Sequence, residues 1–194
     1  MQLIFLFAAV MALPSLTFGQ GIGLGIKGGL NFANVDVKNI PGQSFDTKTG
    51  YHIGGVVIIN LSEKWGIQPE LLFSAQGTET PDSKSDFNYL SIPILLRWKP
   101  VDLLSIEAGP QFGILLSAEE DLVGDVKDAF KSNDSGVALG ATVHLPLGLN
   151  VGARYYWGIG NILEDPDFFD LDSDAEVKNK MFQIYVGWTF LGQK

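Results

Sequence analysis

Eight segments of this chain alternate between apolar residues and small or polar residues with a period of two. Residues 181–190 show the pattern most clearly, because all of their even positions are large and apolar: Phe182, Ile184, Val186, Trp188 and Phe190. Successive side chains of a strand point to opposite faces, so such a segment predicts a strand with one apolar and one mixed face. The other seven segments lie at residues 22–32, 51–61, 65–76, 89–99, 105–117, 136–145 and 149–159.

The connections between these segments alternate in length. Long connections lie at residues 34–49, 77–87, 118–134 and 160–179, and short ones at 62–64, 100–103 and 146–148. Barrels of the bacterial outer membrane have short periplasmic turns and long external loops. The sequence therefore predicts an all-β fold, an eight-stranded antiparallel up-and-down transmembrane β-barrel of a Gram-negative bacterium, with both ends of the barrel chain on the periplasmic side.

Charged residues within the eight segments fall on the mixed face. An eight-stranded barrel has an interior just wide enough for packed side chains, so charges of both signs can pair there while the apolar face contacts lipid. The predicted lumen network comprises Lys27, Glu70, Arg97, Glu107 and Arg154, joined by Tyr156 through its inward parity. A structural plug is the favoured interpretation, because buried charges mostly neutralise one another, and a proton or ion path is the alternative.

Aromatic residues gather near the predicted strand ends, as in the two interfacial girdles of membrane barrels. Trp65, Trp98, Trp188 and Phe190 lie toward the periplasmic ends, and Trp157 lies toward an external end. The alternative is a soluble β-sandwich with ordinary strand aromatics. The sequence also predicts bulges or local breaks where proline removes a ladder donor, at Pro69, Pro93 and Pro110.

Residues 1–20 carry no charge and are mostly apolar from Leu3 to Leu16. Small residues at Thr17 and Gly19 suit a cleavage site before Gln20, so residues 1–19 are predicted to be a secretory signal peptide and residues 20–194 the barrel domain. An N-terminal membrane anchor is the alternative, although the apolar run is short for a span. The chain has no Cys, which excludes disulfides and thiol chemistry.

The long connections are acidic, with net formal charges of 0, −2, −4 and −6 in chain order. In the last one, the alternate residues Asp170, Asp172, Asp174 and Glu176 have an oxygen-rich spacing that suits weak calcium binding. A solvated acidic loop is favoured, because the sixth-position Gly and twelfth-position Glu of an EF-hand are missing. An acidic rim suits divalent-ion bridging to lipopolysaccharide or contact with a basic partner. The net charge of −9 argues against nucleic-acid binding.

The two histidines, His52 and His144, have inward parity and lie on nonadjacent predicted strands. No Ser/His/Asp spacing accompanies them, so no enzymatic activity is expected.

Several stretches carry a resemblance to a known family: Gly-Ile-Lys-Gly-Gly-Leu-Asn at 25–31, Tyr-Leu-Ser-Ile-Pro-Ile-Leu-Leu-Arg-Trp at 89–98, Glu-Ala-Gly-Pro-Gln-Phe-Gly-Ile-Leu-Leu-Ser at 107–117, Gly-Val-Ala-Leu-Gly-Ala at 136–141, and Ala-Arg-Tyr-Tyr-Trp-Gly-Ile-Gly-Asn-Ile at 153–162. The chain resembles the PorT-like outer membrane β-barrel proteins of Bacteroidetes-type bacteria. The resemblance implies an outer-membrane location and an eight-stranded barrel, but no agreed activity; the best-known member is associated with protein secretion.

The sequence thus predicts a monomeric barrel with a structural or binding role, whose partners are outer-membrane lipid, lipopolysaccharide and an extracellular or secretion-machinery protein. The alternatives are a narrow channel or transporter for small solutes and an accessory component of protein secretion. No cofactor is expected beyond weakly bound calcium.

Overall fold

The computed structural model describes residues 21–38, 46–79, 84–120, 124–125, 133–160 and 176–192. Almost all of them lie in strands, which are listed here in chain order: β1 (Ile22–Lys38), β2 (Asp46–Asn60), β3 (Trp65–Glu79), β4 (Lys84–Val101), β5 (Leu104–Glu120), β6 (Gly124–Asp125), β7 (Asn133–His144), β8 (Leu149–Gly158) and β9 (Glu176–Leu191). One 3-10 turn, η2 (Pro146–Gly148), joins β7 to β8. Among these residues, no helix is both long and apolar enough to cross a membrane.

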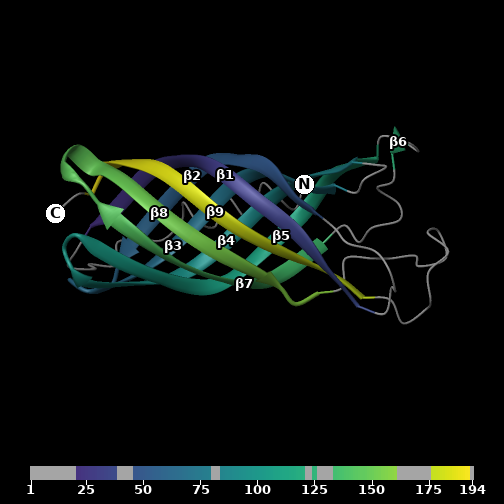
Figure 1. The fold of residues 1–194 in the computed structure, drawn as a ribbon. Helices are drawn as coiled ribbons and strands as arrows, with labels where there is room; N and C mark the ends of the chain where they lie inside the picture. The colour runs from purple at the N-terminus through teal and green to yellow at the C-terminus, as the bar shows by residue number, and fades with distance from the viewer. Residues whose placement is uncertain are drawn as a thin grey trace, which may run out of the picture.

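The eight long strands form one closed antiparallel sheet (Figure 1). Their order is β4-β3-β2-β1-β9-β8-β7-β5, and β5 pairs back onto β4, while the two-residue β6 pairs only with the end of β5. The first and last strands meet in a seam that runs from Leu24↔Leu191 to Lys38↔Glu176. The predicted eight-stranded up-and-down barrel is therefore confirmed.

Short turns lie at one end of the barrel, beside the C-terminus, and the strand ends that lead into the long connections lie at the other (Figure 1). The strands reach further toward the long connections than the alternation predicted. β1 continues to Lys38, β2 begins at Asp46 and β9 begins at Glu176. Backbone ladders do not require apolar side chains, so pairing continues past the point where the apolar face ends.

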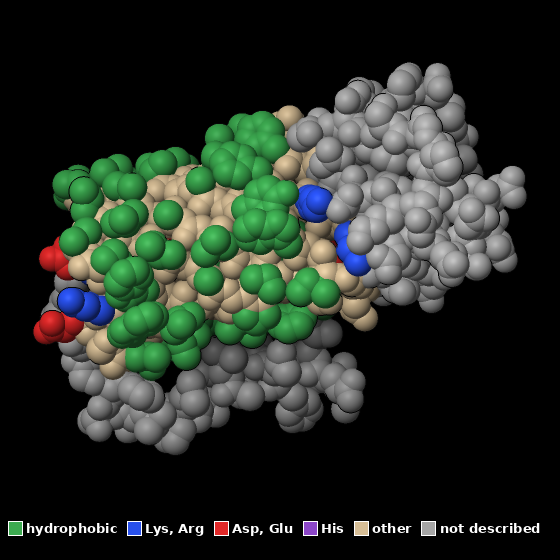
Figure 2. Space-filling model, turned by 60° about the horizontal axis from the view of Figure 1, so that its bottom comes forward, with side chains coloured by type: hydrophobic (Ala, Val, Ile, Leu, Met, Phe, Trp, Pro, Cys, Tyr) green, Lys and Arg blue, Asp and Glu red, His purple; other side chains and the backbone are tan. Residues whose placement is uncertain are grey.

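The outer face of the barrel is apolar, as Figure 2 shows on one side, where hydrophobic side chains cover the wall between the two ends. Val186 is 63% exposed and Ile53 is 60% exposed, whereas Arg154 on the opposite face of the sheet is 1% exposed. This distribution is the one that the predicted parity requires. Since a closed barrel has no free edge, the apolar wall can contact lipid without unpaired backbone groups.

Aromatic side chains pair on the outer face near both ends. Their ring centroids are 4.3–6.3 Å apart in five pairs: Trp65–Trp98, Trp188–Phe190, Tyr155–Trp157, Phe32–Phe182 and Tyr51–Phe73. The first two pairs lie toward the short turns and the other three toward the long connections. All five aromatics predicted at the lipid interface are exposed: Trp65, Trp98, Trp157, Trp188 and Phe190.

The predicted bulges or local breaks at the three prolines take the form of breaks without bulges. The β2–β3 ladder skips two steps between Val56↔Glu70 and Ile59↔Ile67, a gap that includes Pro69, and its register does not shift there. Similar gaps without a shift lie beside Pro93 in the β3–β4 ladder and beside Pro110 in the β4–β5 ladder. Proline removes one donor but adds no residue, so the strand stays in register.

A bulge does occur near the far end of β5, and it corrects one predicted orientation. Tyr89 pairs with Leu115, whereas Asn88 pairs with Ser117, so Leu116 is the extra residue. The bulge moves Ser117 off the predicted inward face. In its actual position the side chain is half-buried, and its hydroxyl accepts a hydrogen bond from Asn88 Nδ2 at 2.9 Å. Ala118 is buried in its place.

Candidate functional site in the lumen

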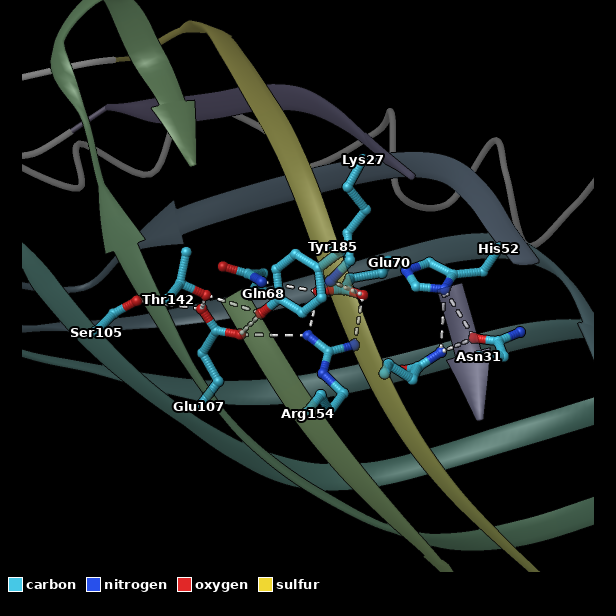
Figure 3. Close-up of polar contacts among 11 residues, drawn as sticks. Lys27, Asn31, His52, Gln68, Glu70, Ser105, Glu107, Thr142, Arg154 and Tyr185 are labelled. Carbon is cyan, nitrogen blue, oxygen red and sulfur yellow. Dashed lines mark hydrogen bonds and ion pairs between the residues drawn. The ribbon is translucent and has the colours of Figure 1, made fainter. Parts of the chain in front are cut away.

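A network of four charged side chains crosses the middle of the lumen (Figure 3). Arg154 of β8 donates from Nη1 to Glu70 Oε2 and from Nη2 to Glu70 Oε1, both at 2.8 Å. Lys27 of β1 donates to both oxygens of the same carboxylate at 3.0 Å. Arg154 Nη2 also reaches Glu107 Oε2 of β5 at 3.2 Å. Glu70 thus accepts from two cations, and Arg154 connects the two carboxylates.

The four strands that carry this network, β1, β3, β5 and β8, are every second strand around the barrel. Alternation along each strand directs Lys27, Glu70, Glu107 and Arg154 inward, and the even spacing of the strands lets the side chains meet near the axis. Two cations face two anions, so the cluster is formally neutral. Neutralisation is what fully buried charges require, because each unpaired ion in a low-dielectric interior costs several kcal/mol.

Neutral side chains complete the hydrogen bonding of both carboxylates. Gln68 Nε2 donates to Glu70 Oε1 at 2.8 Å. Thr142 Oγ1 donates to Glu107 Oε1 at 2.7 Å, and Tyr185 OH donates to Glu107 Oε2 at 3.3 Å. The ring of Tyr185 also lies 3.9 Å from Lys27 Nζ, as a cation–π contact. These three partners share the inward parity of the charged residues, but the sequence analysis did not assign them to the network.

Arg97 makes no ion pair with the central cluster, contrary to its predicted place there. Arg97 Nη2 lies 3.0 Å from His144 Nε2, and because a guanidinium only donates, that ring nitrogen accepts. His144 Nδ1 then carries the proton and donates to Asn150 Oδ1 at 2.6 Å. Arg97 therefore belongs to a polar layer nearer the short turns, which Ser105 links to Glu107 of the central cluster.

Ser105 adds a hydroxyl to this layer, with Oγ 2.9 Å from His144 Nε2 and 3.1 Å from Glu107 Oε1. Ser105, His144 and Asn150 thus have the order of a nucleophile, a base and an orienting group, assembled from three strands that no sequence spacing could relate. Ser105 is 0% exposed, however, and Arg97 occupies the same nitrogen that a base would use. The arrangement leaves no approach for an acyl substrate.

His52 lies in another layer, on the opposite side of the central cluster. Its Nδ1 is 2.8 Å from Asn31 Oδ1, which also accepts from Gln183 Nε2 at 2.8 Å. Asn31 Nδ2 in turn donates to Ser74 Oγ at 3.0 Å. This layer ties β1, β2, β3 and β9 together through neutral groups, and it brings His52 nowhere near His144.

Tyr156 does not join the charged network and bonds to Asp134 instead. Its hydroxyl donates to Asp134 Oδ2 at 3.0 Å, and Asn179 Nδ2 donates to the same oxygen at 2.9 Å. The sequence analysis placed Asp134 in an acidic external connection. The structure places it in β7, buried inside the barrel, because that strand begins earlier than its apolar alternation does.

Apolar side chains fill the lumen beyond this point. Phe87, Tyr89, Leu115 and Ala118 form one buried cluster, and Ala33, Tyr156 and Met181 form another. Toward the short turns, a cavity of about 30 Å³ lies among polar groups that include Lys27, Glu107, His144, Asn150 and Tyr185. That volume accommodates about two water molecules, since one needs roughly 10–15 Å³.

Within the described ranges, no group of three or more His, Asp or Glu side chains is arranged to hold a metal ion. Asp170, Asp172 and Asp174 of the predicted calcium site lie outside the described residues, and Glu176 is the first residue of β9. The calcium site and the signal peptide at residues 1–19 therefore stay predictions.

A scan of protein families matches residues 17–164 to the family described as outer membrane protein beta-barrel domain. No curated protein sequence matches the chain. Among solved structures, Neisserial surface protein A has a TM-score of 0.57 at 12% identity, over 88% of this chain and 100% of that one. Ail of Yersinia pestis has a TM-score of 0.48 at 17% identity, over 87% of this chain and 99% of that one. OprG of Pseudomonas aeruginosa has a TM-score of 0.46 at 14% identity, over 88% of this chain and 97% of that one.

The narrower PorT-like resemblance is not part of these matches and stays a prediction, and the likeness to Neisserial surface protein A concerns the fold alone. The family match covers more than half of the sequence, and the closed barrel with its apolar outer wall and charged interior agrees with it. The chain therefore belongs to the outer membrane protein β-barrel domain family and resides in the outer membrane.

Proposed function

We propose that this protein is a non-conducting, non-enzymatic membrane anchor whose binding role lies at its external rim. The observation that carries the proposal is the Lys27–Glu70–Arg154–Glu107 network, which reaches the axis from every second strand. A solute that passed through would have to separate ion pairs that water cannot compensate at that depth. The network therefore favours a plug over a path.

Two further features support a closed lumen. The buried cluster of Phe87, Tyr89, Leu115 and Ala118 fills the interior on the side of the long connections. On the other side, the cavity of about 30 Å³ is large enough for water but not for a nutrient-sized solute. A narrow channel or transporter is the alternative. It requires the buried cluster to move and the small cavity to widen.

The external rim is the remaining place for a binding function. Without the buried Asp134 and the residues of β9, the two most acidic connections carry net charges of −3 at 118–133 and −6 at 160–175. Carboxylates at a membrane surface suit calcium- or magnesium-bridged contact with the phosphates of lipopolysaccharide, or contact with a basic protein. An accessory role in secretion is a special case of contact with a basic protein, in which the partner belongs to the secretion machinery.

Planar-bilayer recording of the refolded protein tests the plug. We expect no steady unit conductance from the unmodified chain. The Glu70→Ala/Arg154→Ala double variant, which removes the bond across the lumen, serves as the comparison; conductance in this variant alone would identify the network as the barrier. Steady unit conductance from the unmodified protein would contradict the proposal and favour the channel.

Binding to vesicles that contain lipopolysaccharide tests the rim. Because Glu176 is the first residue of β9, the deletion is limited to residues 164–175, and a full-length variant with Asn in place of the Asp residues of that stretch is the matched control for loop length. We expect calcium-dependent binding that both variants lose. Binding that survives both changes would remove this segment from the proposed function.

A further inference from the structure

The turn between β7 and β8 differs in composition from the other two turns at the same end of the barrel. It consists of Leu145, Pro146, Leu147, Gly148 and Leu149, and no Lys, Arg, Asp or Glu occurs between residues 136 and 153. The β2–β3 turn instead carries Glu63 and Lys64, and the β4–β5 turn carries Asp102, all of them exposed. One of the three turns is therefore wholly apolar.

The leucine at the tip of this turn is not explained by turn geometry. Leu147 has a φ of 62°, a left-handed conformation that Gly or Asn adopts more easily. It is also the most exposed large apolar side chain described, at 87%. Since Gly or Asn would suit the backbone better, the turn conformation does not account for Leu147, and its exposed apolar side chain points to a surrounding other than water.

Four of the five backbone carbonyls of the turn accept hydrogen bonds from within the protein. Pro146 O accepts from the N–H of Leu149, and Leu149 O accepts from the N–H of Leu145 at 2.8 Å. Gly148 O accepts from Asn150 Nδ2 at 2.9 Å, and Leu147 O accepts from Trp188 Nε1 at 3.0 Å. Carbonyls without water must find such partners, so these four groups do not require water at the turn.

The bond from Trp188 also sets the depth of the turn. Trp188 is one of the exposed aromatics at the short-turn end, where indole rings favour the membrane interface. Because its indole nitrogen bonds to Leu147 O, the tip lies at the level of this girdle rather than beyond it. The apolar wall continues into the turn through Val143, Leu145, Leu149 and Val151, which are all exposed.

We propose that the Leu145–Leu149 turn is inserted into the phospholipid leaflet on the periplasmic side, while the Glu63–Lys64 turn stays in water. The barrel then sits with its β7–β8 side deeper than its β2–β3 side, or the leaflet thins around that side. The occupant of this apolar surface is lipid, because the surface is continuous with the lipid-facing wall and carries no charge that a protein partner could recognise.

The absence of cysteine allows a clean test by single labelling. Leu147→Cys and, as the matched control, Lys64→Cys are each labelled with an environment-sensitive nitrobenzoxadiazole dye and refolded into phosphatidylcholine vesicles. Lipids brominated on the acyl chain are then included as quenchers. We expect at least twofold stronger quenching at position 147 than at position 64, and the reverse order with aqueous iodide.

The heat-dependent gel mobility typical of folded barrels confirms that each labelled variant is native. If Leu147→Cys does not fold, Leu145→Cys replaces it, with the same expectation. Equal bromolipid quenching at the two turns, or iodide quenching that is stronger at position 147, would overturn the insertion. Neither result depends on whether the lumen conducts, so this inference and the proposed function stand or fall separately.

Discussion

Arg154 and Glu70 form two parallel hydrogen bonds of 2.8 Å although 84 residues separate them in the chain. Their strands, β8 and β3, lie four strands apart in either direction around the barrel, so the pair spans its diameter. Lys27 and Glu107 extend the same cluster toward the two remaining quarters. Ion pairs thus connect opposite sides of the barrel wall across the lumen.

Replacing the shared carboxylate should destabilise the barrel strongly. Glu70→Gln keeps the shape of the side chain but leaves Lys27 and Arg154 with one anion between them. We expect the free energy of unfolding to fall by about 3–5 kcal/mol, because breaking a buried ion pair leaves an uncompensated charge. Urea titration of vesicle-embedded protein, followed by tryptophan fluorescence, measures the loss.

Glu63→Gln is the control for this change, since the same chemical substitution on an exposed turn should shift stability by less than about 0.5 kcal/mol. A loss below about 1 kcal/mol for Glu70→Gln would mean that water reaches the network.

Removing Lys27 together with Glu70 should lower the free energy of unfolding by less than the sum of the two single changes. Lys27→Met alone leaves the cluster with an excess anion, whereas Lys27→Met/Glu70→Gln leaves Arg154 opposite Glu107 and restores neutrality. We expect a coupling free energy of about 0.5–3 kcal/mol in a double-mutant cycle of unfolding free energies. Strict additivity would show that Lys27 and Glu70 do not interact, despite their 3.0 Å contacts.

Two adjacent glycines of β2 should respond very differently to substitution by alanine. A Cβ on Gly54 would lie within 3 Å of backbone atoms of Leu71 and Leu72, whereas a Cβ on Gly55 would meet nothing within 4 Å. Gly54→Ala should therefore lower the unfolding free energy by about 1–3 kcal/mol or prevent closure, as overpacking does. Gly55→Ala should be close to neutral. Refolding yield by gel mobility measures both, and similar yields for the pair would contradict the packing.

A charge on the lipid-facing wall should be costly in proportion to its depth. Ile94 is exposed near the middle of β4, so Ile94→Arg should destabilise the barrel by about 2–4 kcal/mol in vesicles. Leu61→Arg, on the β2–β3 turn, is the control and should cost about 0–1 kcal/mol near the interface. Equal effects at the two sites would indicate that the mid-strand position is not surrounded by hydrocarbon.

The alternation was sufficient to predict which side of the wall the charged strand residues face, and hence the burial of Lys27, Glu70, Glu107 and Arg154. It could not predict the level at which side chains from different strands meet. Even residues at one ladder position can bond to different partners: Arg97 lies opposite Glu107 in the β4–β5 ladder but bonds to His144, and Tyr156 bonds to Asp134.

The alternation of apolar and polar residues also could not predict where strands begin and end or where a bulge interrupts them. β7 begins at Asn133, before its apolar pattern starts, and this early start buries Asp134. The bulge at Leu116 changes the orientation of Ser117 without any proline or glycine at that residue to signal it. Both features follow from the pairing of β5 with its neighbours, which involves residues far apart in the chain.

The seam between β1 and β9 makes closure depend on β9, the last strand of the barrel. A polypeptide truncated before residue 176 has no partner for the edge of β1 and exposes two rows of unpaired amides, which hydrocarbon does not accept. Residence in the bilayer is therefore coupled to the presence of β9, because without that strand the sheet cannot close.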